Sequence, residues 1–146
     1  MIKTVLVPVD LAHRARHRDQ LGAAVRIANS EQAALHLLTV LEAPPVLVSQ
    51  YLPSRYQQSL SDQTQTQLRA LVSQMAPGFE PADVRVRFGS VYREILAAAA
   101  ELKADLIVMG SHDPGPEDYL LGSNAARVVR HAHCSVFIVR PSPDAA

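Results

Sequence analysis

The sequence predicts an α/β fold, in which a parallel β-sheet is covered by helices on both faces. Two observations lead to this prediction. Short apolar segments rich in β-branched residues alternate along the chain with segments whose apolar residues recur every three or four positions. About five strands and about four helices follow one another in this way, which is typical of parallel sheets built from strand–helix–strand units.

Five segments are predicted to be strands. Residues 3–9 (KTVLVPV) and 34–40 (ALHLLTV) are apolar runs, typical of strands that are buried on both faces. Residues 83–89 (DVRVRFG) alternate apolar residues with arginines, which indicates a half-exposed strand near an edge of the sheet. Residues 105–110 (DLIVMG) and 135–140 (SVFIVR) complete the set.

Helical periodicity appears between these strands. Three helices are predicted from it, around residues 21–28, 60–75 and 95–102. A short helix that starts near Gly122 precedes the last strand. The connection after the second strand contains Pro44, Pro45 and Pro53, so we expect an irregular segment there, because proline lacks a donor and restricts the residue before it.

Length and composition limit the possible functions. The 146 residues predict a single domain over residues 1–141 and a loose tail over 142–146. A formal net charge of zero argues against a nucleic-acid or membrane-surface binder. Cys134 has no partner for an internal disulfide, which fits a reducing compartment. Neither a signal peptide nor a membrane-spanning run is predicted, so we expect a cytoplasmic protein.

The ends of three predicted strands carry candidate binding residues. Ligands of open parallel sheets lie beyond the carboxyl ends of the strands, where the winding direction switches. Here the first strand ends in Pro8-Val9-Asp10, the second at Val40 and the fourth in Met109-Gly110-Ser111-His112. An aspartate directly after a buried strand can accept hydrogen bonds from a ribose diol. The alternative is that Asp10 caps the following turn or helix.

The segment Gly122-Ser123-Asn124 opens the last predicted helix. Glycine lets the backbone approach a ligand closely, and a helix N-terminus presents free N–H groups and a partial positive charge. The Ser123 hydroxyl adds a donor. These features predict an anion site, and a plain helix cap is the alternative.

Four segments in this order carry a resemblance to a known family: KTVLVPVD, VRFGSVYREIL, ADLIVMGSH and YLLGSNAARVVRHAHCSVFIVR. The chain resembles a universal stress protein over essentially its whole length, and the last segment is most similar to the F- and G-type branch. The resemblance implies a Rossmann-like fold of the adenine nucleotide alpha hydrolase type, with strand order 3-2-1-4-5. It also implies an ATP site between strands one and four, and homodimers paired through the last strand, here residues 135–140.

The resemblance assigns nucleotide binding to Pro8, Val9, Asp10, Val40, Met109, Gly110, His112, Gly122, Ser123 and Asn124. Asp10 and Gly110 would hold the ribose, and Pro8, Val9 and Val40 would wall the adenine. Gly122-Ser123-Asn124 would contact the phosphates, and His112 could donate a hydrogen bond to a phosphate oxygen. ATP, or AMP, is therefore the expected ligand, with Mg²⁺ as an optional companion of ATP.

The loop between Gly110 and Gly122 departs from the family motif. That motif is Gly, two residues, Gly, nine residues, then Gly-Ser or Gly-Thr. Gly110 and Gly122-Ser123 match its ends, but Asp113 replaces the middle glycine and the following spacer is one residue shorter. Pro114 restricts Asp113 to extended conformations. The departure leaves the residues predicted to recognise adenosine in place. It puts the binding of the outer phosphates by this loop in question.

Charged residues near this loop have two interpretations each. Asp113, Glu117 and Asp118 either face water or hold a Mg²⁺ that bridges the phosphates. Arg14 or Arg16 either helps to hold phosphate or belongs to a solvated loop.

The leading functional prediction is a regulatory nucleotide-binding protein without catalytic residues. The sequence has neither a Walker lysine nor an obvious base beside a nucleophile. One alternative is a slow ATPase or self-phosphorylating protein with Ser123 as acceptor. The other is a dimeric interaction module that has lost nucleotide binding. No metal site is predicted, because His131 and His133 do not share a helix face.

Overall fold

The computed structural model describes residues 1–12, 17–111 and 121–141. The predicted tail, residues 142–146, lies outside them. The described part of the chain forms β1 (Thr4–Pro8), α1 (His17–Glu31), β2 (Ala34–Leu41), α2 (Val46–Ser49), α3 (Tyr56–Met75), β3 (Asp83–Phe88), α4 (Val91–Leu102), β4 (Leu106–Gly110), α5 (Ser123–His131) and β5 (Ser135–Val139). All five predicted strands are found to within one residue at each end.

The five strands form one parallel sheet in the order β3-β2-β1-β4-β5, which confirms the predicted fold class and strand order. β3 lies at an edge, as its alternating arginines predicted. The chain winds outward from β1 to β3 and then returns to β4 on the other side of β1. The winding direction therefore switches between β1 and β4, where ligands of such sheets bind.

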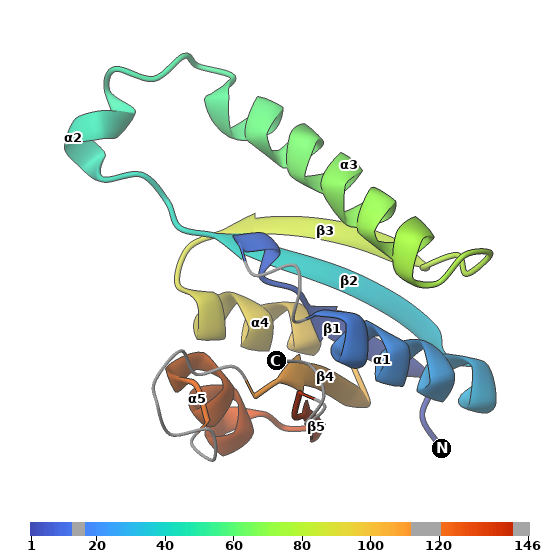
Figure 1. Ribbon diagram of the computed structural model, residues 1–146. Helices are drawn as coiled ribbons and strands as arrows, with labels where there is room; N and C mark the ends of the chain where they lie inside the picture. Colours follow the sequence, from blue (N-terminus) through green and yellow to red (C-terminus); the bar gives the residue numbers. More distant parts are fainter. Residues whose placement is uncertain (13–16, 112–120, 142–146) are drawn as a thin grey trace.

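Helices cover both faces of the sheet (Figure 1). On one face, α1 and α3 pack against alternate residues of the strands, among them Val5 and Val7. On the other face, α4 and α5 pack against the intervening residues, among them Leu6 and Ile107. Because successive strand residues point to opposite faces, a continuous apolar run such as TVLV supplies both cores at once.

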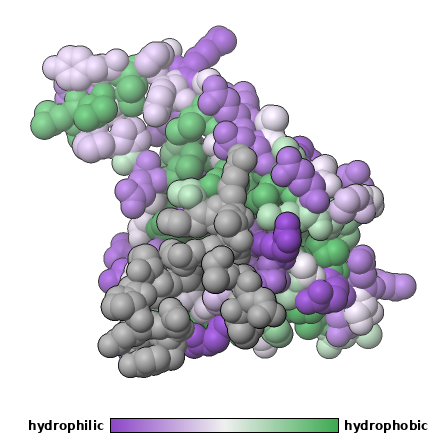
Figure 2. All heavy atoms as spheres, in the orientation of Figure 1, coloured by the Kyte–Doolittle hydropathy of each residue, from purple (hydrophilic) through white to green (hydrophobic). Residues whose placement is uncertain are grey.

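The connection after β2 contains the short helix α2, which the sequence did not predict. Its single turn follows Pro45, whose carbonyl accepts hydrogen bonds from the N–H groups of Val48 and Ser49, both at 2.9 Å. One turn is too short to show a helical period. Figure 1 shows this turn away from the sheet, and Figure 2 shows apolar surface at the same place in the view. Val46 and Leu47 are each 76% exposed.

Within the ranges described above, no helix is long and apolar enough to cross a membrane.

Candidate functional site at the carboxyl ends of β1 and β4

The gap between the ends of β1 and β4 is bridged by a side chain of α1. Direct pairing of the two strands covers Val5 with Leu106 and Leu6 with Ile107. Beyond that, Gln20 Nε2 donates hydrogen bonds to the main-chain oxygens of Pro8, at 2.6 Å, and Val108, at 3.0 Å. Gln20 is 3% exposed. Its amide therefore takes the place of a strand neighbour and fixes how far the two strand ends spread.

Sequence reasoning missed this residue, although a signal was present. Gln20 occupies the same helical stripe as Leu21, Ala24 and Ala28, all of which are buried. A polar side chain on the apolar face of a helix needs a hydrogen-bond partner, because burying an unpaired amide is costly. The partners are main-chain carbonyls, which the sequence does not reveal.

His17, one turn earlier in α1, belongs to the same buried group. It is 5% exposed, and its ring lies between two oxygen atoms. The main-chain oxygen of Asp10 accepts a hydrogen bond from Nε2, and the Gln20 side-chain oxygen lies 3.2 Å from Nδ1. α1 thus ties together the end of β1 and the residue that follows it.

Val9 and Asp10 at the end of β1 have different environments. Val9 is 4% exposed and packs into the core under α1 and α3. Its main chain is also engaged, since its N–H donates to Leu38 and its oxygen accepts from the Thr39 hydroxyl. Asp10 is exposed, and its Oδ1 accepts a hydrogen bond of 3.0 Å from the Ala12 N–H. This contact matches the capping alternative, and it also holds the carboxylate at the crevice.

The remaining predicted binding residues of the strands lie on β2 and β4. Val40 is partly buried, and Met109 is 7% exposed; both contact the core under α4 and α5. Gly110 ends β4. A Cβ placed there would meet Gln20 Oε1 at 3.8 Å, an ordinary contact, so crowding by the described protein atoms does not require a glycine. Among the described residues, Gln20 is the one whose atoms come within 4 Å of such a Cβ.

The predicted anion segment lies at the start of α5. Gly122 precedes the helix in an extended conformation, and its oxygen accepts the Ala126 N–H at 2.9 Å. Because Gly122 has no side chain, it cannot cap the first N–H groups of the helix. Ser123 is exposed and Asn124 is partly buried. α5 leads through a short link into β5, which is parallel to β4, so α5 begins at the carboxyl edge of the sheet.

Several predicted residues lie outside the described ranges. They are Arg14, Arg16, His112, Asp113, Pro114, Glu117 and Asp118. Among the described residues, the structure brings Pro8 and Gly110 next to Gln20, and Asp10 next to His17.

Other candidate groups have structural contacts. Cys134 is partly buried beside α4 and α5, and burial raises the pKa of its thiol. His36 Nδ1 lies 3.6 Å from the Asp83 carboxylate. Over the described ranges, no group of three or more histidine, cysteine, aspartate or glutamate residues is arranged to hold a metal ion.

Comparison with known proteins identifies the family. Residues 1–140 match the model of the Universal stress protein family. The chain belongs to this family. It is 34% identical to Universal stress protein G of Escherichia coli O157:H7 over 145 residues, which cover 96% of this chain and 100% of the relative. This likeness confirms the predicted resemblance to the G-type branch.

Solved structures agree with this fold. The hypothetical protein MJ0577 superimposes on this universal stress protein with a TM-score of 0.78 and 21% identity, over 99% of each chain. A universal stress protein solved in complex with cAMP superimposes with a TM-score of 0.62 and 25% identity, over 97% of this chain and 98% of the other.

Proposed function

We propose that this universal stress protein binds an adenine nucleotide, ATP or AMP, and acts in the cytoplasm as a regulatory dimer rather than as an enzyme. The observation that carries the proposal is the crevice between β1 and β4. Gln20 bridges its two strand ends, and among the described residues a Cβ at Gly110 would meet only Gln20. The family member solved with cAMP supports an adenine nucleotide as the ligand class.

The described residues suit the adenosine part of such a ligand. Asp10 is exposed at the rim, and the Ala12 N–H orients its carboxylate, which could accept from a ribose hydroxyl. Pro8 and Val40 offer partly buried apolar surface for the base. The Val9 side chain is already packed in the core. Val9 would therefore contribute only by placing the neighbouring residues Pro8 and Asp10.

The phosphates would meet the start of α5. Free N–H groups and the partial positive charge of a helix N-terminus attract anions, and Ser123 and Asn124 add polar side chains. His112 is proposed to donate a hydrogen bond to a phosphate oxygen. The loop acids Asp113, Glu117 and Asp118 are proposed to face water or, as the alternative, to hold a Mg²⁺ ion. Mg²⁺, when bound, would neutralise phosphate charge, because hard cations prefer carboxylate and phosphate oxygens.

The decisive experiment is to heat-denature the purified protein and identify any released nucleotide by chromatography, together with a thermal-shift titration. We expect released ATP or AMP and a rise in melting temperature when either nucleotide is added. No release and no shift would favour a nucleotide-independent interaction module. Phosphate production above a buffer blank would favour an ATPase. If ATP affinity did not change when Mg²⁺ is chelated, Mg²⁺ would have no role in nucleotide binding.

A matched pair of glycine variants locates the site. A methyl group at Gly110 meets only Gln20 Oε1 among the described residues, at 3.8 Å, but it would occupy the space proposed for the ribose, so Gly110→Ala should weaken nucleotide binding about tenfold or more, roughly 1.4 kcal/mol. Gly22→Ala is the control, because a Cβ on Gly22 meets Arg26 at 3.9 Å, on the helix itself. Equal nucleotide affinity in both variants would show that the nucleotide does not bind at the end of β4.

The dimer is proposed to form through β5. This strand pairs with β4 along one side and lies at the edge of the described sheet, with Phe137 45% exposed. An unpaired edge of this kind can pair with its counterpart across a two-fold axis. Phe137→Asp should therefore give monomers by light scattering, and an intact dimer would count against this interface.

A further inference from the structure

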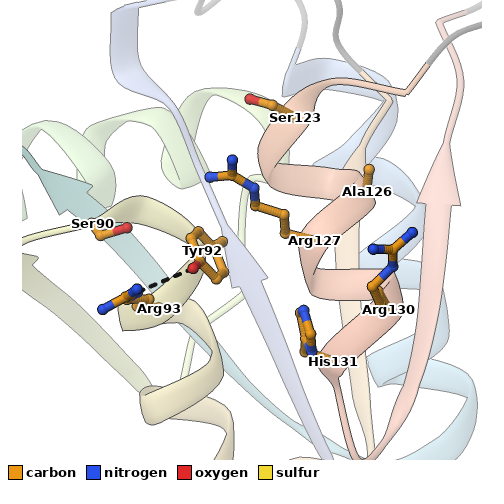
Figure 3. A pocket seen from close by; sticks show the side chains of 8 residues that line it. All are labelled: Ser90, Tyr92, Arg93, Ser123, Ala126, Arg127, Arg130 and His131. Atoms are coloured by element: carbon orange, nitrogen blue, oxygen red, sulfur yellow. Dashed lines mark hydrogen bonds between the residues drawn. The ribbon is translucent and has the colours of Figure 1, made fainter.

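A groove between α4 and α5 collects positive charge. Its volume is about 680 Å³, and its lining includes three arginines: Arg93 on α4, and Arg127 and Arg130 on α5. Figure 3 shows these side chains together with Tyr92 and Ser123, on two neighbouring helices. Among the described residues that line the groove, none carries a carboxylate.

These arginines differ from the arginines on the other side of α4. There, Arg87 Nε donates to Glu94 at 2.9 Å, and its NH1 group donates to Glu101 at 2.9 Å. Over the described ranges, by contrast, Arg93, Arg127 and Arg130 make no ion pair with a carboxylate. Like charges three residues apart on a helix, such as Arg127 and Arg130, repel each other. A bound anion would relieve that repulsion.

Tyr92 holds two of the guanidinium groups in place. Arg93 Nε donates a hydrogen bond of 3.0 Å to the Tyr92 hydroxyl. The guanidinium carbon of Arg127 lies 4.9 Å from the centre of the Tyr92 ring, within the range of a cation–π contact. In Figure 3, Arg127 extends from α5 toward this ring. Side chains that are already ordered lose less entropy when a ligand binds.

The groove is also separate from most of the crevice between β1 and β4. Among the predicted crevice residues that the structure describes, Ser123 lines the groove, whereas Pro8, Val9, Asp10, Val40 and Gly110 do not. Ser90, which precedes α4, lines it as well. The N-terminal ends of α4 and α5, which carry partial positive charge, thus lie at one end of the groove, and His131 at the C-terminal end of α5 lines the other.

We propose that this α4–α5 groove is a second binding site, for a small anion with two or more linked phosphate groups. Guanidinium groups bind phosphate through paired hydrogen bonds, and three of them call for more than one phosphate. The volume suits a small ligand. A nucleic acid is disfavoured, because the net charge of the chain is zero and the unpaired arginines gather in one groove.

Calorimetric titration with pyrophosphate, and with orthophosphate for comparison, tests the proposal at low salt. We expect saturable pyrophosphate binding, tighter than orthophosphate binding and weakened by added potassium chloride. Arg127→Gln should raise the pyrophosphate dissociation constant about tenfold, as expected for the loss of a charge-assisted hydrogen bond. The control is Arg69→Gln, which removes the same charge from the exposed surface of α3, on the opposite face of the sheet.

Two results would overturn the proposal: the absence of saturable binding, or equal pyrophosphate affinity in the Arg127 variant and the parent. The Gly110→Ala variant then separates the groove from the crevice. It should bind pyrophosphate as the parent does, even if its nucleotide affinity falls. Loss of pyrophosphate binding in this variant would assign the phosphate groups to the crevice and refute a second site. Failure of the nucleotide proposal alone would leave these pyrophosphate results unchanged.

Discussion

The crevice between β1 and β4 and the groove between α4 and α5 differ in how their polar side chains are paired. In the crevice, the Gln20 amide donates to Pro8 and Val108, and the Asp10 carboxylate accepts from Ala12. In the groove, Arg93 and Arg127 contact Tyr92 rather than a carboxylate. In the crevice, these polar side chains are hydrogen-bonded to the main chain. In the groove, the arginine side chains are exposed to solvent.

The same contrast recurs on the two sides of α4. Toward β3, Arg85 and Arg87 are paired with Asp83, Glu94 and Glu101. Toward α5, the arginines are unpaired within the described residues. Polar groups that are satisfied within the chain should contribute to stability, whereas unpaired arginines should matter when a ligand is present. Substitutions in each region can test this difference.

The largest effect on stability is expected for Gln20→Leu. The leucine fills a similar volume but leaves the main-chain oxygens of Pro8 and Val108 without their donor. A buried acceptor without a partner costs about 1–3 kcal/mol, so we expect the free energy of unfolding to fall by about 2 kcal/mol. Urea denaturation followed by circular dichroism measures this change.

Arg127→Gln supplies the contrasting variant. Arg127 is exposed, and surface substitutions usually change the free energy of unfolding by less than about 0.5 kcal/mol. If Gln20→Leu were equally harmless, the amide would not be holding the two strand ends. The difference between a crevice whose polar groups are paired within the chain and a groove whose arginines are not would then disappear.

A smaller effect is expected for Arg87→Gln. Its side chain is 25% exposed, and its guanidinium joins Glu94 and Glu101. These contacts raise the pKa of Arg87, chiefly through the hydrogen bond to Glu94. Losing a partly exposed pair of this kind should cost about 1 kcal/mol in the free energy of unfolding. Arg93→Gln, on the opposite side of α4, should cost less, and equal losses would show that pairing does not distinguish the two sides.

The fold could be predicted almost completely from the sequence because its signals are local. Apolar runs predict the buried strands 4–8 and 34–41, and the arginines at 85 and 87 predict the edge position of β3. The strand order came from the family resemblance rather than from periodicity. The helix α2 was missed because a single turn carries no repeating pattern.

The site was predictable only where a residue type alone indicates its role. Gly110 and Gly122 stood out because glycine permits close approach of a ligand. For Gln20 the sequence shows only a polar residue on a buried helical stripe, since its role depends on two carbonyls, one of them 88 residues away in sequence. The groove was missed for the same reason. Its arginines are separated in the chain, and only the packing of α4 against α5 brings them together.

Among the substitutions of paired residues, the smallest effect on stability is expected for Asp83→Asn, and it depends on pH. Partial burial, the largest single influence, raises the pKa of Asp83, but Arg85 and His36 together outweigh it, so the pKa lies below its ordinary value of 3.8. A carboxylate with a depressed pKa stabilises the folded state above the unfolded-state pKa, and this contribution is lost as the pH falls through the folded-state value. The parent should therefore be more stable than Asp83→Asn near neutral pH. The two should converge well below pH 3.8 in urea denaturation. In an Arg85→Gln background the difference should shrink at neutral pH, and an undiminished difference would show that Arg85 is not the partner responsible.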